Sequence, residues 1–349
     1  MADIFDSFEL KHLKLPNRVV VAPMTRMQCG TEGIPTDAVI AYYRRFAEGG
    51  AGLIITEGVY TDTTASKGYF GEPGIVNGAQ EAGWKKVADA VHSAGGLVGM
   101  QLFHTGRCSH SKIIGRTPLA PSAVPAKGMH ASAGGPMEMP EAMTEAQIEE
   151  SLQGFTDSSR KAKASGMDCV EIHGAHGYLI HQFYYSDSNT RTDRWGGMIE
   201  NRIRFPVELV RRVRAAVGPD YPVLYRFSEF RVDDLKYSHP ETLDIFRALV
   251  PALEKAGVDV FHVSTYDAFK PFHDTGKPLL AHVREMTKKP LVGVGKLGED
   301  PARARELVRS GLAELAALGK PMLANADWAN RVRTGQPLTP FEPMMMARL

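Results

Sequence analysis

Cysteine is scarce in this chain, with three residues among 349, and their pattern limits what they can do. Cys29, Cys108 and Cys169 are odd in number and lack the spacing of metal ligands. They therefore argue against a disulfide framework or a zinc site, and they favour a reducing compartment.

An excess of charge of one sign and long apolar runs are also missing. Lys and Arg number 41 against 40 Asp and Glu, so the formal net charge of +1 gives no electrostatic sign of a nucleic-acid partner. No apolar run reaches the roughly 18 residues of a transmembrane helix, so we expect no association with a membrane. Residues 1–18 show no basic region followed by an apolar core, which argues against a signal peptide and makes the cytoplasm the expected location.

The composition is that of an ordinary globular protein, with 43% hydrophobic and 23% charged residues. The length would suit two domains, but single α/β barrels reach the same size. Because no repeat or low-complexity linker divides the chain, we predict one domain over residues 1–349.

Short apolar segments alternate with helical patterns along most of the chain. The apolar segments have the composition of parallel strands covered on both faces. They span residues 19–22, 53–56, 97–102, 169–172, 223–227, 258–263, 290–294 and 315–318. Helical patterns occupy residues 35–48, 79–94, 145–165, 199–217, 241–256, 278–288, 300–310 and 326–334. Eight such units predict an α/β fold, a closed (β/α)8 TIM barrel, with a doubly wound open sheet as the alternative.

One connection is unusually long. Residues 103–143 are rich in Gly, Pro, Ser and Met and lack helical periodicity. Loops of this length in compact domains are usually functional or mobile. Since this one follows the third predicted strand, we expect it to cap the active-site face of the barrel.

Polar residues stand at the carboxyl ends of several predicted strands, where barrel enzymes place their active sites. The segment His173-Gly-Ala-His176-Gly-Tyr178 follows the fourth strand. Imidazoles can donate hydrogen bonds to a carbonyl oxygen, and a phenol can pass a proton to carbon. A metal site is a weaker interpretation, because the two histidines are closely spaced and no third ligand is evident. Two loop histidines beside a structural tyrosine are the remaining alternative.

The segment from Gly293 to Gly298 matches G-x-G-x-x-G, which alone would suggest a dinucleotide-binding unit. Only one predicted strand follows it, so a phosphate site is the better interpretation. Barrels often build such sites from the loops after strands seven and eight, and Lys320 would add a positive charge. A glycine-rich turn with a solvated lysine is the alternative. Arg226, at the end of the fifth strand, could bind an electron-rich ring or a carboxylate, or form an ordinary ion pair.

Taken together, several motifs identify a family resemblance that covers about residues 5–335. They are Leu15-Pro-Asn-Arg18, Ala22-Pro-Met-Thr-Arg26, Gln101-Leu-Phe-His-Thr-Gly-Arg107, Ala120-Pro-Ser122, Glu171 to Leu179, Arg191 to Gly197, Glu200-Asn-Arg202 and Arg226-Phe-Ser228. The chain resembles the old yellow enzyme family of FMN-dependent ene-reductases, also called the NADH:flavin oxidoreductase family. The resemblance implies a (β/α)8 barrel with FMN at its C-terminal mouth.

The resemblance also implies roles for individual residues. Pro23, Met24 and Thr25 would face the flavin ring, and Gly58 would lie close to it. Gln101 would contact the pyrimidine edge and Arg226 the N1 and O2 side. The FMN phosphate would be held by Gly295, Lys296, Gly319 and Lys320. The family usually has Arg at the position of Lys320, and Lys lacks the planar two-point grip of Arg on phosphate.

The implied reaction transfers hydride from NADPH or NADH through flavin N5 to the β carbon of an α,β-unsaturated carbonyl compound. His173 and His176 would bind the carbonyl oxygen, and Tyr178 would protonate the α carbon. The expected partner is a small-molecule substrate with an activated alkene. Relatives range from monomers to larger assemblies, so a homo-oligomer is compatible with the resemblance. The alternatives are an oxidative relative, such as an amine dehydrogenase or demethylase, and a flavin-free isomerase or aldolase acting on a phosphorylated substrate.

Overall fold

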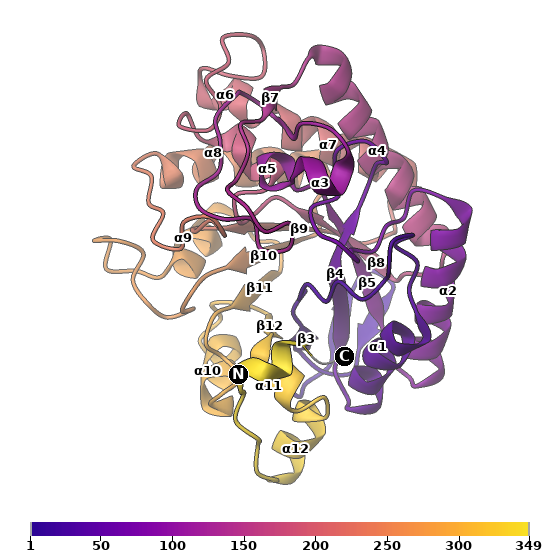
Figure 1. Cartoon of the computed structure of the whole chain (residues 1–349). Coiled ribbons are helices and arrows are strands. Elements are labelled where there is room, and N and C mark those ends of the chain that lie inside the picture. Colours follow the sequence, from indigo (N-terminus) through magenta and orange to yellow (C-terminus); the bar gives the residue numbers. More distant parts are fainter. Residues whose placement is uncertain (1, 348–349) are drawn as a thin grey trace.

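The computed structural model describes residues 2–347 and contains a closed barrel of eight parallel strands (Figure 1). In barrel order the strands are β3 (Val19–Val21), β4 (Leu53–Tyr60), β5 (Val98–Phe103), β8 (Cys169–His173), β9 (Val223–Ser228), β10 (Val260–Ser264), β11 (Leu291–Val294) and β12 (Leu315–Leu318). The barrel closes where Val21 on β3 pairs with Leu318 on β12. The predicted (β/α)8 barrel is therefore confirmed, and the open-sheet alternative is wrong.

Helices surround the barrel, as Figure 1 shows. The longer ones are α1 (Asp37–Glu48), α2 (Gly78–Ser93), α4 (Glu145–Ala164), α7 (Arg204–Val217), α8 (Thr242–Ala256), α9 (Leu279–Met286), α10 (Pro301–Arg309) and α12 (Trp328–Thr334). Four begin at side chains that cap the free backbone N–H groups of the first turn, namely Thr36, Asn77, Thr144 and Asp300.

The predicted helix at 199–217 is interrupted at Ile203. The structure divides it into α6 (Ile199–Arg202) and α7. Pro206 has no N–H group to donate to the carbonyl of Arg202, so a continuous helix would lose a hydrogen bond there. The sequence pattern showed the apolar periodicity on both sides of this break but did not reveal the break.

An antiparallel hairpin, which the sequence analysis did not predict, closes the N-terminal end of the barrel. It consists of β1 (Phe8–Leu10) and β2 (Leu13–Leu15). Its buried leucines pack into one cluster with Leu53 and Val260, the first residues of their strands. Because this end is covered, the opposite, C-terminal end is the one open to a ligand.

The long connection at 103–143 contains more regular structure than its sequence suggested. It forms η1 (Gly106–Cys108), α3 (Ser111–Ile114) and a two-stranded sheet of β6 (Leu119–Ala120) and β7 (Glu141–Ala142). Two further short helices, α5 (Leu179–Tyr184) and α11 (Lys320–Ala324), follow β8 and β12. Within residues 2–347, no helix combines the length and apolar character needed to cross a bilayer.

Candidate active site

Strand pairing places many of the predicted site residues at one end of the barrel. Gly58 on β4 pairs with Gln101 on β5, which pairs with Glu171 on β8. His173, two residues after Glu171, pairs with Arg226 on β9. Paired residues, and residues two apart on a strand, share a face of the sheet. The register therefore gathers these residues on one face, near the carboxyl ends of four adjacent strands.

Glu171 lies at the centre of a buried polar chain. Its Oε1 accepts a hydrogen bond from Nε2 of Gln101 at 2.8 Å, and its Oε2 lies 2.6 Å from Nδ1 of His262 on β10. Burial alone would raise the pKa of the Glu171 carboxyl, but His262 and Arg226 lower it below its ordinary value. Burial lowers the pKa of His262. A carboxylate that accepts hydrogen bonds from a neutral imidazole and an amide accounts for this geometry.

His173 and His176 meet edge to face at the end of β8. Nε2 of His173 and Nδ1 of His176 are 3.4 Å apart, and the ring planes are inclined by 89°. The turn that brings them together has His176 and Gly177 in succession in the left-handed region, with φ of 61° and 83°. This conformation is costly for a residue other than glycine and is characteristic of functional sites.

Each of the two imidazoles stacks on an aromatic ring. His173 stacks on Phe103 and His176 stacks on Phe230, with ring centroids 5.2 and 4.9 Å apart. Burial, and then the nearby charge of Arg226, lower the pKa of both histidines well below the ordinary value. Both rings are therefore neutral near pH 7, and each carries one N–H donor.

Tyr178 packs against Phe103 and His173, and its hydroxyl contacts the hydroxyl of a second tyrosine, Tyr69. Its ring meets Phe103 edge to face at 4.5 Å and lies 5.3 Å from His173. Its hydroxyl oxygen is 2.8 Å from that of Tyr69. Burial raises the pKa of Tyr178 well above the ordinary value, so the phenol keeps its proton until a strong base takes it.

Arg226 is a buried cation near the barrel mouth, 6% exposed. Its Nη2 donates to Oγ of Ser264 at 3.3 Å, and the same oxygen lies 2.9 Å from Nε2 of His176. Burial lowers the pKa of Arg226, although a guanidinium still remains charged. Within residues 2–347, its Nε has no hydrogen-bond partner. It can therefore receive an anionic or electron-rich group.

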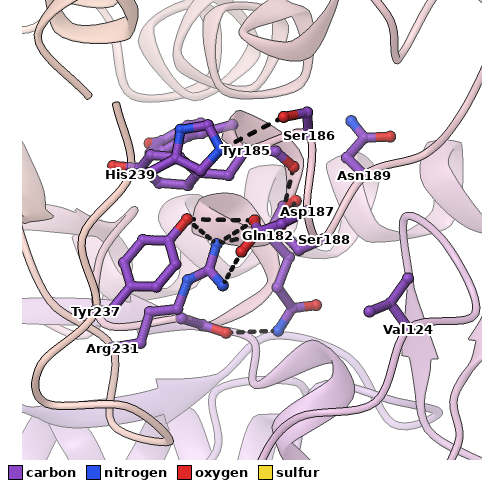
Figure 2. A network of polar contacts seen from close by, with 12 residues as sticks. Val124, Gln182, Tyr185, Ser186, Asp187, Ser188, Asn189, Arg231, Tyr237 and His239 are labelled. Carbon is purple, nitrogen blue, oxygen red and sulfur yellow. Dashed lines mark hydrogen bonds and ion pairs between the residues drawn. The ribbon is translucent and has the colours of Figure 1, made fainter. Parts of the chain in front are cut away.

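The loop at 229–237, which follows β9, is fixed by the network in Figure 2. The Arg231 guanidinium donates to both carboxylate oxygens of Asp187, at 3.0 and 2.8 Å, and to the Tyr237 hydroxyl at 2.7 Å. It also lies 3.5 Å from the centre of the Tyr237 ring. The N–H of the next residue, Val232, donates to the His176 carbonyl at 2.9 Å. These contacts tie the loop that carries Phe230 to the turn that carries His176.

The predicted phosphate-binding residues lie on the loops after β11 and β12. Gly295 has φ of +141°, and a Cβ there would come within 2.7 Å of the Thr265 carbonyl oxygen. A Cβ on Gly319 would meet only Met24, whose Sδ would be 3.6 Å away, so the approach to this backbone is open.

The two lysines on these loops lie over different aromatic rings, and the residues after β3 differ in exposure. Lys296 and Lys320 are exposed, with their amines over the rings of Tyr266 and Phe341. Pro23 and Met24 are half-buried after β3, and Thr25 is exposed. The structure thus brings Met24 and Gly319 together, whereas it shows no contact between the two lysines.

These features fit FMN, which carries an electron-rich pyrimidine ring and a phosphate. Arg226 supplies a buried charge whose Nε has no hydrogen-bond partner among the described residues, and Gln101, whose Nε2 donates to Glu171, has an amide oxygen to offer. The open backbone at Gly319 and the exposed Lys320 suit a phosphate. Within residues 2–347, no group of three or more His, Cys, Asp or Glu residues is arranged to hold a metal ion.

Several residues of the site were not recognised in the sequence. His262, Ser264 and Tyr69 join it only through contacts across the fold. The signal for His262 and Ser264 was the presence of polar residues in an otherwise apolar strand. Tyr69 lies in a loop with no pattern that marks it.

Comparison with known proteins identifies the family of the chain. The profile of the NADH:flavin oxidoreductase / NADH oxidase family matches residues 3–339. NADH oxidase of Thermoanaerobacter brockii is 33% identical over 344 residues, which cover 96% of this chain and 51% of that protein. The chain therefore spans about half the length of that relative.

Two solved structures match over nearly their whole length. Morphinone reductase in complex with tetrahydroNAD has a TM-score of 0.89 and 33% identity, covering 99% of this chain and 94% of that one. The old yellow enzyme homologue from Zymomonas mobilis has a TM-score of 0.89 and 30% identity, covering 99% and 96%. The chain therefore belongs to the NADH:flavin oxidoreductase family and is an FMN-dependent, NAD(P)H-using oxidoreductase of the old yellow enzyme type.

Proposed function

We propose that the chain reduces the carbon–carbon double bond of α,β-unsaturated carbonyl compounds with NADPH or NADH. The observation that carries this proposal is the cluster of His173, His176 and Tyr178 at the barrel mouth. Two neutral N–H donors beside one protonated phenol suit a carbonyl oxygen and a carbon that must gain a proton. The relative named morphinone reductase supports the reductive direction.

Each side chain has a distinct role in this reaction. His173 and His176 donate to the carbonyl oxygen and draw electron density from the double bond. Tyr178 gives its hydroxyl proton to the α carbon. When bound, FMN supplies the hydride that reaches the β carbon, after taking it from the nicotinamide.

The proposed FMN contacts are those implied by the resemblance. Arg226 would place its charge at the N1 and O2 side, and Gln101 would contact the pyrimidine edge. Pro23, Met24, Thr25 and Gly58 would line the ring. The phosphate would be held by Gly295, Lys296, Gly319 and Lys320.

We propose that residues 103–143 cap the site. A cavity of about 240 Å³ beside Tyr69 and Cys108 is lined by Lys127, His130 and Met137 from this segment. The segment is also tied to the loop after β9 by the ion pair between Arg107 and Asp233, at 3.5 Å. This arrangement supports a cover over the phenol side of the site.

We propose a cytoplasmic location and no nucleic-acid or membrane partner. The three cysteines are free and buried, which supports a reducing compartment. Cell fractionation tests the location, and recovery of the protein in an oxidising compartment would contradict it.

Anaerobic stopped-flow spectroscopy of the FMN-loaded protein tests the reaction. NADPH or NADH should bleach the flavin absorbance, and an enone should restore it. We expect Tyr178→Phe to slow reoxidation by the enone while leaving reduction by the nicotinamide nearly intact. Equal loss in both half-reactions would refute the role of Tyr178. Bleaching by a candidate amine, with no reoxidation by enones, would assign the oxidative direction instead.

A further inference from the structure

Ser264 links the buried cation of the site to one of its two imidazoles. It is the last residue of β10 and is buried. Its Oγ lies 3.3 Å from Nη2 of Arg226 and 2.9 Å from Nε2 of His176. Both are polar contacts at the carboxyl end of the barrel, one to the neighbouring strand β9 and one to the turn after β8.

The chemistry of the groups fixes the direction of one of these hydrogen bonds and leaves two arrangements for the other. A guanidinium can only donate, so the Ser264 oxygen accepts from Arg226. The hydroxyl still has its own hydrogen and can donate it to Nε2 of His176, or its second lone pair can accept a proton carried by Nε2. Where the hydroxyl donates, the neutral imidazole of His176 carries its proton on Nδ1.

The proton on the other imidazole is placed by the backbone. Nδ1 of His173 accepts the N–H of Ala175 at 3.3 Å, which leaves the proton of His173 on Nε2. Nε2 of His173 and Nδ1 of His176 are the two nitrogens that lie 3.4 Å apart. Two N–H groups at that separation can share one acceptor oxygen, whereas the other tautomer of His176 would turn a lone pair toward that oxygen.

We propose that Ser264 is a positioning residue that holds His176 in the Nδ1–H tautomer, so that both imidazoles donate to a single substrate oxygen. The proposal rests on the proposed function, because it assumes a carbonyl ligand between the two histidines. Ser264 acts through His176 and does not itself touch the substrate.

Two substitutions of matched shape isolate the hydroxyl. Ser264→Thr keeps it and Ser264→Val removes it, and both β-branched side chains suit a strand. The holoenzyme is labelled with ring-15N histidine, and His176 is assigned with a His176→Asn variant. Protonated and unprotonated ring nitrogens have clearly separated 15N shifts, so the tautomer is read directly without turnover.

The wild type and Ser264→Thr should show the proton on Nδ1 of His176, and Ser264→Val should shift it toward Nε2. The dissociation constant of a saturated cyclic ketone, measured by the change in flavin absorbance, should rise roughly tenfold in Ser264→Val only. An unchanged His176 tautomer in Ser264→Val would overturn the proposal, even if activity fell.

Failure of the proposed function gives a different result. If enones were not reduced but the tautomer and the ketone affinity changed as expected, the role of Ser264 would stand and the reaction would be wrong. If Ser264→Val weakened ketone binding and Ser264→Thr weakened it equally, the effect would be one of shape, and the proposal would be overturned.

Discussion

Glu171 and His262 form a carboxylate–imidazole pair with no exposed surface, in which Oε2 lies 2.6 Å from Nδ1. The second carboxylate oxygen binds Gln101 and thereby fixes the amide so that its oxygen stays free. The pair thus determines which atom Gln101 can offer to a ligand at the barrel mouth.

Glu171→Gln should destabilise the fold and weaken FMN binding. The new amide would place an N–H group against Nε2 of Gln101, and the buried Arg226 would lose its nearest negative charge. A buried polar group left without its hydrogen-bond partner costs about 1–3 kcal/mol, and more where a charge is involved. Urea unfolding and an FMN titration measure the two effects. Glu149→Gln is the control, because that carboxylate pairs with Arg212 at the surface and should cost less than about 1 kcal/mol. Equal stability of the two variants would contradict the prediction.

The free energy of unfolding should fall as the pH drops from about 7 to about 5. Burial lowers the pKa of eight histidines in the described part of the chain, namely His104, His130, His173, His176, His181, His239, His262 and His282. The unfolded chain binds protons near pH 6.5 and the folded chain does not, so stability is present above that pH and lost below it. Each histidine contributes about 1.4 kcal/mol per pH unit within this window.

His181→Leu isolates one share of this pH dependence, because His181 lies on α5 outside the proposed carbonyl site. Urea unfolding at several pH values should show a slope that is smaller by one histidine. His12→Leu makes the same exchange at an exposed position and is the matched control. A His181→Leu slope equal to that of the wild type would show that burial does not lower the pKa of His181.

Tyr69→Phe should slow the enone half-reaction by about tenfold or more and leave flavin reduction unchanged. The Tyr69 hydroxyl is 2.8 Å from that of Tyr178 and can donate to the phenolate that forms as the proton leaves. A hydrogen bond to a charged group contributes about 1.5–3 kcal/mol. Tyr221→Phe removes the same atom from a hydrogen bond to the Met167 carbonyl and should change neither half-reaction. Similar rates for Tyr69→Phe and Tyr221→Phe would exclude a role of Tyr69 in proton transfer.

Loosening the loop at 229–237 should raise the KM for the enone several-fold while the rate of flavin reduction stays unchanged. Arg231→Lys keeps the charge but cannot bind both oxygens of Asp187, so it should not preserve the wild-type KM. Lys277→Met breaks an exposed ion pair to Glu285 outside this loop and is the matched control. A wild-type KM in Arg231→Lys would show that the loop does not hold His176 through Phe230.

Lys320→Arg should lower the dissociation constant of FMN several-fold. The planar guanidinium can bind two phosphate oxygens at once, which the Lys320 amine cannot. Quenching of flavin fluorescence on binding provides the titration. Lys288→Arg makes the same exchange at another exposed position and should leave the affinity unchanged. An unchanged dissociation constant in Lys320→Arg would place the phosphate away from residue 320.

The barrel could be predicted because its strands are apolar on both faces, but strand ends could not be placed where polar residues enter the sheet. The strand predicted at 53–56 continues to Tyr60 as β4. Glu57 and Gly58 concealed this continuation, and the pairing with β5 shifts register between Ile55 and Gly58. Polar residues within a strand therefore indicated the functional site, but they also made the end of the strand hard to predict.

The candidate site was only partly visible in the sequence for a related reason. His173, His176 and Tyr178 stand within six residues, so their shared chemistry was evident without a fold. Glu171 and His262 are 91 residues apart and become neighbours only through the register of three strands. Contacts of this kind depend on strand order, which periodicity does not reveal.

The pairing of β3 with β12 joins the beginning of the barrel to its end, with Val19 opposite Ala316. A ribosome must therefore release almost the entire chain before Met24 and Gly319 can meet. A nascent chain that stops short of β12 would lack part of the proposed FMN site. The appearance of flavin absorbance during synthesis would thus report that translation has passed the last strand. It would also report that the barrel has closed.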